Sequence, residues 1–344
     1  MSKILTSNQR NIAFAQLGRS LAKPDERLSE LINTAHQYNA WFTPQSVAMA
    51  VNAISRMLEK DKLDKWLANT PPDETQTMKS IGLILAGNIP IVGFHDILSV
   101  LISGHKALIK LSSQDKKLIP YILDRLIEIE PGFEQQVNYI ERLKDFDAVI
   151  ATGSNNTSRY FDYYFSKVPH IIRKNRNSVA ILNGQETSNE LRALGQDIFD
   201  YFGLGCRNVS KIFVPQGYDF KTFFESIEDF KTVADHHKYN NNYDYNKSIF
   251  LVNMDKHLDN GFLLLKEDTR TASPLAVVYY EEYESIDQLN LRLMEINEEI
   301  QCAISNLELP ISRLCFGQSQ VPDLWDYADG VNTLEFIKNL PAIN

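Results

Sequence analysis

The sequence predicts an α/β protein built on mostly parallel sheets. Two observations lead to this fold class. Short apolar runs alternate with helical patterns through the middle of the chain, and such alternation is typical of parallel strands joined by helices. The chain up to about residue 66 shows helical patterns only, which predicts a helical segment ahead of the first sheet. The apolar runs comprise residues 81–86, 107–111, 147–151, 178–182 and 209–214, and the helical patterns comprise residues 95–103, 116–130, 157–167 and 189–202.

The N-terminal helices have a recognisable start signal. Thr43 is followed by Pro44; threonine caps the free N–H groups of a helix, and proline suits its first position. Pro71 and Pro72 then end the stretch with helical patterns, before the first apolar run. Between these two signals, apolar residues recur at helical spacing, at Val47, Val51, Ile54 and Leu58.

The C-terminal third predicts a second α/β unit. Residues 247–252, 275–280 and 301–305 have the composition of strands, and residues 286–297 have the pattern of a helix. The polar stretch 235–246 is expected to be a loop. It contains His236 and His237, but no further ligand stands at helical spacing, so no metal site is expected.

Size and charge restrict the class of partner. A chain of 344 residues has room for about two domains. The net charge of -9 and the pI near 5.4 argue against nucleic acid and anionic membranes, since both require a basic surface. No apolar run approaches the ~20 residues of a membrane span, and the first residues lack the apolar core of a signal peptide. We therefore expect a cytoplasmic protein with neither a nucleic-acid nor a membrane partner.

The three cysteines predict neither a disulfide framework nor a zinc site, because they are widely spaced and form no C-x-x-C pair. Cys206 differs from the others because it follows Gly205 at the junction of a helix and a strand. Glycine lets the backbone approach a ligand closely, and the neighbouring Arg207 favours a thiolate. A reactive nucleophile and a packed core thiol both fit this local pattern. Cys302 and Cys315 lie in or beside apolar runs and are expected in the core.

Polar residues follow three of the predicted strands. Ligands of open parallel sheets bind outside the carboxyl ends of the strands, so these loops are candidate sites. The amide of Asn88 can donate to a developing oxyanion or simply complete a turn. Lys110 and Ser113 suit an anionic group of a nucleotide, although a lysine at a strand end is commonly just solvated. Gly153 and Ser154 lie between a strand and a helix start, an arrangement that favours phosphate. No G-x-G-x-x-G fingerprint occurs, so a dinucleotide would bind in another style.

In order and spacing, these residues resemble the aldehyde dehydrogenase superfamily, and within it the LuxC-like acyl-CoA reductases, which reduce fatty acyl groups. The resemblance covers about residues 75–340 and implies an aldehyde-dehydrogenase-like fold with two doubly wound parallel-sheet domains and a helical N-terminal segment. The implied domains are a nicotinamide-cofactor-binding domain at residues 1–173, a catalytic domain at 174–318 and a C-terminal segment at 319–344 that returns to the first domain or an oligomer interface. It is carried by Ala86-Gly87-Asn88-Ile89-Pro90, by Ser103-Gly104-His105-Lys106-Ala107-Leu108-Ile109-Lys110, by Thr152-Gly153-Ser154 and by Gly205-Cys206 before a strand.

Carried over residue by residue, the resemblance makes Cys206 the nucleophile and Asn88 the oxyanion donor that acts with the backbone N–H of Cys206. Lys110 would contact the adenosine ribose, and Gly153 and Ser154 would lie at the pyrophosphate. The implied reaction is reduction of an acyl thioester of coenzyme A or of acyl-carrier protein. It passes through an acyl-cysteine, which the reduced nicotinamide converts to an aldehyde.

Departures from the family pattern refine this expectation. The glutamate base of the oxidising members is missing at the matching residues 173–177, which suits an acyl transfer to or from a thiol that needs no activated water. His170, close to that position, is expected to be structural. Ser113 replaces a ribose-binding glutamate three residues after Lys110, leaves room for a 2′-phosphate, and favours NADPH over NADH. A second ribose-binding glutamate is absent at residues 270–274, which is compatible with a readily exchanged cofactor.

Two alternatives to the reductase stay open. A non-acylating aldehyde dehydrogenase would need a water-activating base, which the sequence does not offer. A catalytically degenerate member would bind acyl groups or nucleotide without turnover. The resemblance is also compatible with a homodimer, in which residues 331–337 would supply a strand to the interface.

Overall fold

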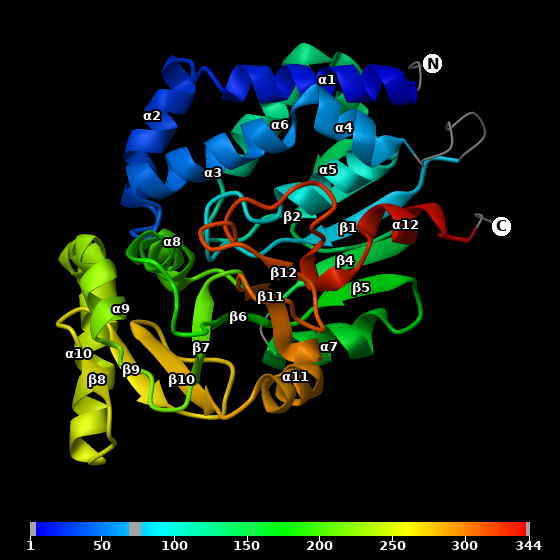
Figure 1. Cartoon of the computed structure of the whole chain (residues 1–344). Coiled ribbons are helices and arrows are strands. Elements are labelled where there is room, and N and C mark those ends of the chain that lie inside the picture. The colour runs from blue at the N-terminus through cyan, green and yellow to red at the C-terminus, as the bar shows by residue number, and fades with distance from the viewer. Residues whose placement is uncertain (1–4, 69–76, 154, 342–344) are drawn as a thin grey trace. The chain divides into compact units, whose positions relative to one another are not determined.

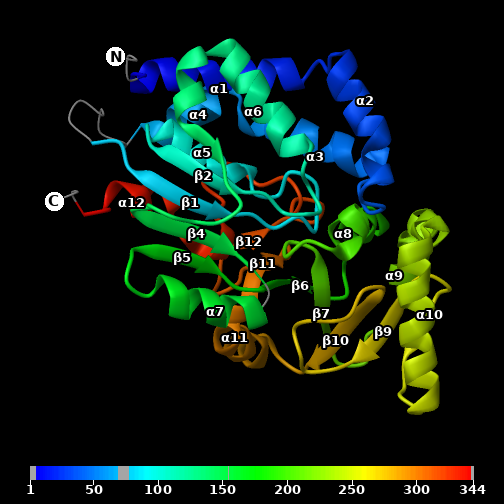
Figure 2. The same cartoon turned by 180° about the vertical axis from the view of Figure 1, so that it is seen from behind.

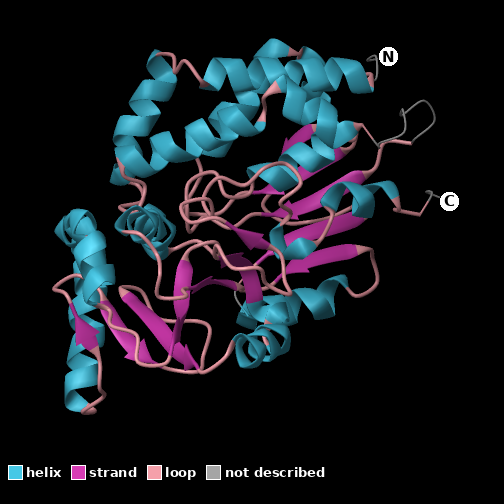
Figure 3. Cartoon of the chain, in the orientation of Figure 1, coloured by secondary structure: helices cyan, strands magenta, loops and turns pink. Residues whose placement is uncertain are grey.

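The computed structural model describes residues 5–68, 77–153 and 155–341 of the chain (Figure 1). The chain divides into two compact units. The N-terminal unit extends to Lys174 and also contains the segment from Pro322 onward, whereas Asn175–Val321 form the second unit. Each unit combines parallel strands with helices (Figure 3), which confirms the predicted α/β fold class.

The N-terminal helices begin at well-formed caps. The Thr6 side chain accepts a hydrogen bond from the backbone N–H of Gln9, and the Gln9 side chain accepts one from the backbone N–H of Thr6. Thr43 accepts from the N–H of Ser46, with Pro44 at the first helical position, as predicted. These caps satisfy N–H groups that a helix start leaves without partners. The elements are α1 (Ser7–Leu21), α2 (Glu26–Thr34), the 3-10 turn η1 (Ala35–Gln37), α3 (Pro44–Met57) and α4 (Lys60–Leu67).

Packing holds these helices together. Helix α1 contacts α3, α4 and α6 (Leu118–Ile129), and the four helices lie together over one side of the sheet in both views (Figures 1 and 2). Phe14 and Leu17 of α1 are completely buried, as is Val47 of α3. Burial of a side chain of this size contributes about 1.5–3 kcal/mol, so tertiary packing stabilises these helices more than intrinsic propensity does.

The N-terminal sheet is parallel, with the strand order β3-β2-β1-β4-β5 in the described residues. Consecutive residues such as Val149 and Ile150 are both buried, so both faces of the sheet are covered. The chain runs from β1 to β2 and β3 on one side and then to β4 and β5 on the other, so the direction of connection reverses between β1 and β4. The elements are β1 (Ser80–Ile84), α5 (Phe94–Ile102), β2 (Lys106–Lys110), α6, η2 (Pro131–Gln135), β3 (Val137–Tyr139), β4 (Ala148–Thr152), α7 (Asn155–Phe165) and β5 (His170–Arg173).

The C-terminal segment ends in a helix and not in a strand. The turn η6 (Ala328–Gly330) precedes α12 (Thr333–Lys338), so the strand predicted at residues 331–337 is wrong. Asn332 caps the helix by accepting a hydrogen bond from the N–H of Glu335. Leu334 and Ile337, three residues apart, are both buried. This spacing belongs to a helix, but six residues are too few to distinguish it from alternation in the sequence.

The second unit contains a larger sheet with the order β12-β11-β6-β7-β10-β9-β8 over its described residues. All neighbouring strands are parallel except β8 and β9, which are antiparallel. Its strands are β6 (Asn177–Ile181), β7 (Val209–Pro215), β8 (Leu258–Asp259), β9 (Leu264–Glu267), β10 (Val277–Tyr283), β11 (Ile300–Ile304) and β12 (Arg313–Leu314). The helices are α8 (Ser188–Phe199), η3 (Asp200–Gly203), α9 (Lys221–Ser226), η4 (Glu228–Asp235), α10 (His237–Val252), α11 (Ile286–Glu295) and η5 (Asn297–Glu299).

Helix α10 overturns two predictions at once. The loop expected at residues 235–246 and the strand expected at 247–252 both fall largely within this one helix. Its buried residues are spaced three or four apart, as one helical face requires. The many asparagines lower helix propensity and masked this spacing in the sequence, but tertiary packing overrides propensity. The buried face consists of Tyr239, Tyr243, Asn246 and Phe250.

A lysine is completely buried in the centre of the second sheet. Lys211 lies on β7, and its Nζ forms an ion pair with Glu281 of β10 and donates to the carbonyl of Asp268 at 2.8 Å. Burial lowers the pKa of Lys211, and the hydrogen bond to Glu281 opposes this shift. Arg292 of α11 donates to the other oxygen of Glu281 at 3.1 Å. The carboxylate therefore compensates a charge that burial alone would make very costly.

Candidate active site

The carboxyl edge of the N-terminal sheet collects several of the predicted site residues. The strand register places Lys110 of β2 and Ala151 of β4 on either side of Ile84 of β1. The loops that carry Asn88 and Gly153 therefore leave the sheet side by side. This is also the point at which the direction of connection reverses, where open α/β sheets bind ligands.

The loop after β1 lies tightly against the loop after β2. A Cβ atom at Gly87 would lie only 2.4 Å from the Oγ atom of Ser112, so only glycine fits there. Asp115 is almost fully buried and accepts hydrogen bonds from the N–H groups of Ile91 at 2.9 Å and Leu118 at 3.2 Å. Ile91 has φ of 60°, a left-handed conformation that a β-branched residue rarely adopts. Burial raises the pKa of the Asp115 carboxyl, and the backbone hydrogen bonds oppose this.

The polar side chains at this edge face solvent. Asn88, Lys110 and Ser113 are exposed, whereas Gly153 is half-buried at the end of β4. Helix α7 begins two residues after Gly153. Ser154, predicted to lie at a pyrophosphate, falls outside the described residues. An anion placed between β4 and α7 would meet the positive end of the helix dipole.

Cys206 of the second unit lies on an irregular turn between α8 and β7, and its thiol is exposed. Tyr201, Phe202 and Gly203 have φ values of 52°, 59° and 78°, so the chain is left-handed at three consecutive residues. Each non-glycine residue in this conformation costs on the order of 1 kcal/mol or more. The ring of Phe202 packs against that of His236, with centroids 4.4 Å apart, and helps to hold the turn.

Hydrogen bonds fix both ends of the Cys206 turn. The N–H of Gly205 donates to Oδ1 of Asn208 at 2.8 Å, and the N–H of Asn208 donates to the carbonyl of Gly205 at 3.1 Å. Ser178 of β6 donates from its hydroxyl to the carbonyl of Cys206 at 3.0 Å. The backbone that carries the thiol is therefore tied to the amino ends of two neighbouring strands, β6 and β7.

The other two cysteines differ in exposure. Cys302 is buried on β11, as predicted, and its Sγ accepts a hydrogen bond from Arg207 at 3.2 Å. The guanidinium that the sequence suggested for the Cys206 thiolate therefore has Cys302 as a partner. Cys315 is exposed, so its predicted place in the core is wrong. It follows β12, a strand of two residues at the edge of the sheet, where few neighbouring elements are available to cover a side chain.

A buried arginine occupies the position that the resemblance matched to the missing base. Arg173, at the end of β5, forms an ion pair with Asp96 of α5, with Nη2 2.6 Å from Oδ1. It also donates to the carbonyl of Ala328 at 2.7 Å and to Thr333 at 3.0 Å. Arg173 therefore joins the C-terminal segment to the sheet. His170, on the same strand, contacts the carbonyl of Val168 through Nδ1 at 2.8 Å, and its structural role stays a prediction.

Two carboxyl groups near the Cys206 turn were missed in the sequence. Asp197 is buried and accepts from the N–H groups of Gly317 at 2.6 Å and Ser319 at 2.9 Å. Burial raises the pKa of Asp197. Burial and the neighbouring Asp197 raise the pKa of Asp200 to about 7. Their position, at the end of an amphipathic helix and a few residues before Gly203 and Gly205, was the available signal. A carboxyl that titrates near neutrality is typical of functional sites and also occurs in structural networks.

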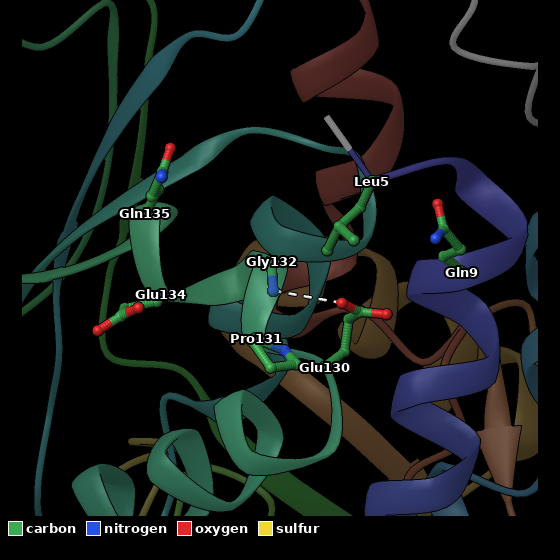
Figure 4. A pocket seen from close by; sticks show the side chains of 7 residues that line it. All are labelled: Leu5, Gln9, Glu130, Pro131, Gly132, Glu134 and Gln135. Carbon is green, nitrogen blue, oxygen red and sulfur yellow. Dashed lines mark hydrogen bonds between the residues drawn. The ribbon is translucent and has the colours of Figure 1, made fainter. Parts of the chain in front are cut away.

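The structure also describes the remaining candidate positions. No group of three metal-ligating side chains occurs among the described residues. Residues 270–274 form a loop between β9 and β10, in which Arg270 pairs with Asp268. A cavity of about 260 Å³ (Figure 4) lies near the start of α1, and there Glu130 accepts a hydrogen bond from the N–H of Gly132. Its lining consists of Leu5, Gln9, Glu130, Pro131, Gly132, Glu134 and Gln135.

The architecture is that of the aldehyde dehydrogenases. An aldehyde dehydrogenase from Pseudomonas aeruginosa matches with a TM-score of 0.63 and 12% identity over 88% of this chain and 72% of its own. An NADP-dependent enzyme from E. coli gives 0.64 and 11% identity over 88% and 74%. An aldehyde dehydrogenase from Mycobacterium tuberculosis, solved with NAD+, gives 0.58 and 13% over 87% and 73%. At such low identity these matches establish the fold.

Within this architecture the family is defined by sequence. The model of the LuxC acyl-CoA reductase family matches residues 15–227, a span that includes Asn88, Lys110 and Cys206. The chain belongs to this family of acyl-CoA reductases. No curated protein matches the chain in sequence. Among the described residues, no helix is both long and apolar enough to cross a membrane.

Proposed function

We propose that the protein reduces acyl thioesters to aldehydes with NADPH, through an acyl group bound covalently to Cys206. The observation that carries this proposal is the exposed Cys206 thiol on a turn held by hydrogen bonds at both ends, in a chain of the acyl-CoA reductase family. A fixed and accessible thiol is what nucleophilic acyl transfer requires.

In the first half-reaction, the Cys206 thiolate attacks the carbonyl carbon of the thioester. The Asn88 amide and the backbone N–H of Cys206 would stabilise the oxyanion, a type of contact worth about 2.7–4 kcal/mol of barrier. The bond to the thiol of coenzyme A or of acyl-carrier protein then breaks, and that thiolate leaves with the electron pair. A reduced nicotinamide held at the N-terminal sheet would supply the hydride that the acyl-cysteine carbonyl accepts. Collapse of the resulting thiohemiacetal returns the electron pair to the Cys206 sulfur and releases the aldehyde.

We assign the dinucleotide to the carboxyl edge of the N-terminal sheet. Helix α7 would direct its N-terminal dipole at a pyrophosphate placed beside Gly153. Lys110 is exposed at the same edge and would contact the adenosine ribose. Ser113 is small and exposed, so a 2′-phosphate has room near a cation, which favours NADPH over NADH.

The buried Arg173 supports the acylating reaction over its hydrolytic alternative. Its guanidinium is committed to Asp96, Thr333 and a carbonyl group, and it supplies no proton acceptor for water. A non-acylating aldehyde dehydrogenase would need such an acceptor. The three cysteines form no disulfide in the described part of the chain, which also suits the reducing cytoplasm that we propose as the site of action.

Intact-protein mass measurement tests the proposal directly. The protein is incubated with a long-chain acyl-CoA without cofactor, as the wild type and as the Cys206→Ala and Cys315→Ala variants. Cys315→Ala is the matched control, because Cys315 is also exposed. We expect a mass increase of one acyl group in the wild type and in Cys315→Ala, none in Cys206→Ala, and discharge of aldehyde on addition of NADPH.

Other outcomes would favour the alternatives. An adduct that is lost only in Cys315→Ala would disprove Cys206 as the nucleophile. If no adduct forms but acyl-CoA raises the melting temperature, the degenerate binding protein is supported. Oxidation of free aldehyde to acid would support the non-acylating dehydrogenase.

A further inference from the structure

We propose that Asn208 is a positioning residue, whose side-chain amide locks the turn that presents the Cys206 thiol for acyl transfer. The inference rests on the proposed function and adds a residue that is neither nucleophile nor oxyanion donor. Asn208 lies two residues after Cys206 and is only 3% exposed.

The Asn208 amide uses both its donor and its acceptor side. Oδ1 accepts from the N–H of Gly205 at 2.8 Å. On the other side, Nδ2 donates to the carbonyls of Asp200 at 2.8 Å, Asp197 at 3.1 Å and Ile198 at 3.3 Å. An asparagine amide offers one acceptor oxygen and two N–H donors. A single side chain therefore connects the end of α8 to the residue directly before Cys206.

These carbonyls come from a helix end, where such groups have no partner within the helix. A buried carbonyl without a partner is unfavourable, so removal of Asn208 would leave several unsatisfied groups together. Between these helix-end carbonyls and Gly205, the chain forms the left-handed turn at Tyr201, Phe202 and Gly203. Strained backbone of this kind persists only where its surroundings hold it.

The thiol gains its orientation from this arrangement. The side chain of Asn208 binds the backbone before Cys206, its own N–H binds the carbonyl of Gly205, and Ser178 binds the carbonyl of Cys206. The remaining freedom of the thiol is mainly rotation about its own χ1 angle. Acyl transfer needs the sulfur and the oxyanion donors aligned on one carbonyl, and displacement by about 1 Å can cost about 100-fold in rate.

The chemistry of residue 208 makes the idea specific. An aspartate has the same shape and could still accept from Gly205, but it would turn a second oxygen toward three carbonyl oxygens. The amide is therefore required for its donors and not only for its volume. Asn208→Asp should impair acyl transfer nearly as much as Asn208→Ala does.

The test compares acylation with a reaction that needs no alignment. Single-turnover acylation by a long-chain acyl-CoA is followed as a function of its concentration in the wild type, Asn208→Ala and Asn208→Asp. Alkylation of Cys206 by iodoacetamide is followed in the same proteins at the peptide that contains it. We expect the maximal acylation rate to fall about 30- to 100-fold with the half-saturating concentration nearly unchanged, and alkylation to change by less than about threefold.

Ser305→Ala serves as the matched structural control. Ser305 is completely buried in the same unit and donates to the carbonyl of Ile181 at 2.9 Å. It follows the carboxyl end of β11, however, whereas Cys206 lies before the amino end of β7. Its loss should lower the melting temperature and leave acylation within about twofold of the wild type. If both Asn208 variants fail to fold, Ser178→Ala removes the neighbouring anchor of Cys206 and should slow acylation about fivefold.

The inference is overturned if the Asn208 variants, or Ser178→Ala in their place, acylate within about twofold of the wild type. It is also overturned if Ser305→Ala slows acylation as much as the Asn208 variants do while lowering the melting temperature by the same amount. Failure of the proposed function has a different signature: the wild type itself would take up no acyl group while its Cys206 still reacted with iodoacetamide.

Discussion

The carboxylate of Asp115 accepts a hydrogen bond from the backbone N–H of Ile91 at 2.9 Å, and so joins the loops that follow two neighbouring strands. Ile91 lies three residues after Asn88 and has a left-handed backbone. A buried acceptor at this point offsets the strain and fixes the loop that carries Asn88. The proposed oxyanion donor is thus positioned by a residue from the proposed cofactor side.

Asp115→Ala tests this connection. Loss of the carboxylate leaves the N–H groups of Ile91 and Leu118 without their acceptor, so we expect the free energy of unfolding to fall by about 2–3 kcal/mol. Nucleotide affinity should fall as well, because the loop relaxes. Urea unfolding and nucleotide titration measure the two effects. Asp219→Ala removes an exposed turn acceptor and should change neither by much.

Asn88→Ala tests the proposed oxyanion donor. Removal of one such donor typically lowers the rate by about 100- to 1,000-fold, and we expect this loss in acylation of Cys206. Alkylation of Cys206 by iodoacetamide forms no oxyanion and should be unchanged. Asn306→Ala, at an exposed asparagine of the second unit, is the control. A loss below about tenfold in Asn88→Ala would count against the role.

Ser113→Glu tests the basis of cofactor choice. A carboxylate near Lys110 would repel a 2′-phosphate and could accept hydrogen bonds from the two ribose hydroxyls of NADH. We expect the preference to shift toward NADH by about tenfold or more in the ratio of kcat/KM values. Gln114→Glu adds the same charge one residue further on, at another exposed position, and should shift the ratio less. An equal shift in both variants would indicate a general charge effect.

The pair of Arg173 and Asp96 is expected to stabilise the N-terminal unit strongly. Both side chains are nearly buried, so Arg173→Met leaves an uncompensated carboxylate and should cost about 3–5 kcal/mol in urea unfolding. Arg27→Met breaks an exposed pair with Asp124 and should cost less than about 1 kcal/mol. Combining Arg173→Met with Asp96→Asn should recover part of the loss, and strict additivity of the two changes would contradict a direct coupling.

Asp200 should make stability depend on pH near neutrality. Its pKa rises from an ordinary 3.8 to about 7 in the folded protein, because burial and the neighbouring Asp197 disfavour the charged form. The folded state therefore holds the proton more tightly, and the associated stability is complete below pH 4 and is lost as the pH rises through 7. Asp200→Asn should therefore become more stable relative to the wild type, in unfolding free energy, as the pH rises from 5 to 8. If the difference in unfolding free energy between the two proteins does not change with pH, the raised pKa of Asp200 is refuted.

The buried strands were the part of the fold that the sequence predicted best. The apolar runs at residues 81–86 and 209–214 correspond to β1 and β7, because short uninterrupted apolar runs suit strands covered on both faces. The edge strands β8 and β12 contain two residues each, too few for a pattern. Helix α10 was missed because its asparagines resemble a loop in local propensity.

The site was predicted in part. Glycines and strand ends pointed to the loops of Asn88, Lys110 and Cys206, and the structure brings the first two to one sheet edge. The roles of all three stay predictions. Asp115 and Asn208 were not found, because their importance comes from backbone groups that they reach only after folding. Composition and spacing carry no record of such contacts.

Because Lys211 is completely buried, its chemical modification can report local opening of the second sheet. Amine-reactive reagents modify surface lysines of a native protein, but its Nζ is enclosed between β7, the carboxylate of Glu281 and the carbonyl of Asp268. Modification of Lys211 therefore requires the second sheet to separate, at least locally. Acyl thioesters themselves modify exposed amines slowly, so the same enclosure protects the centre of this sheet from the reagent that the protein is proposed to consume.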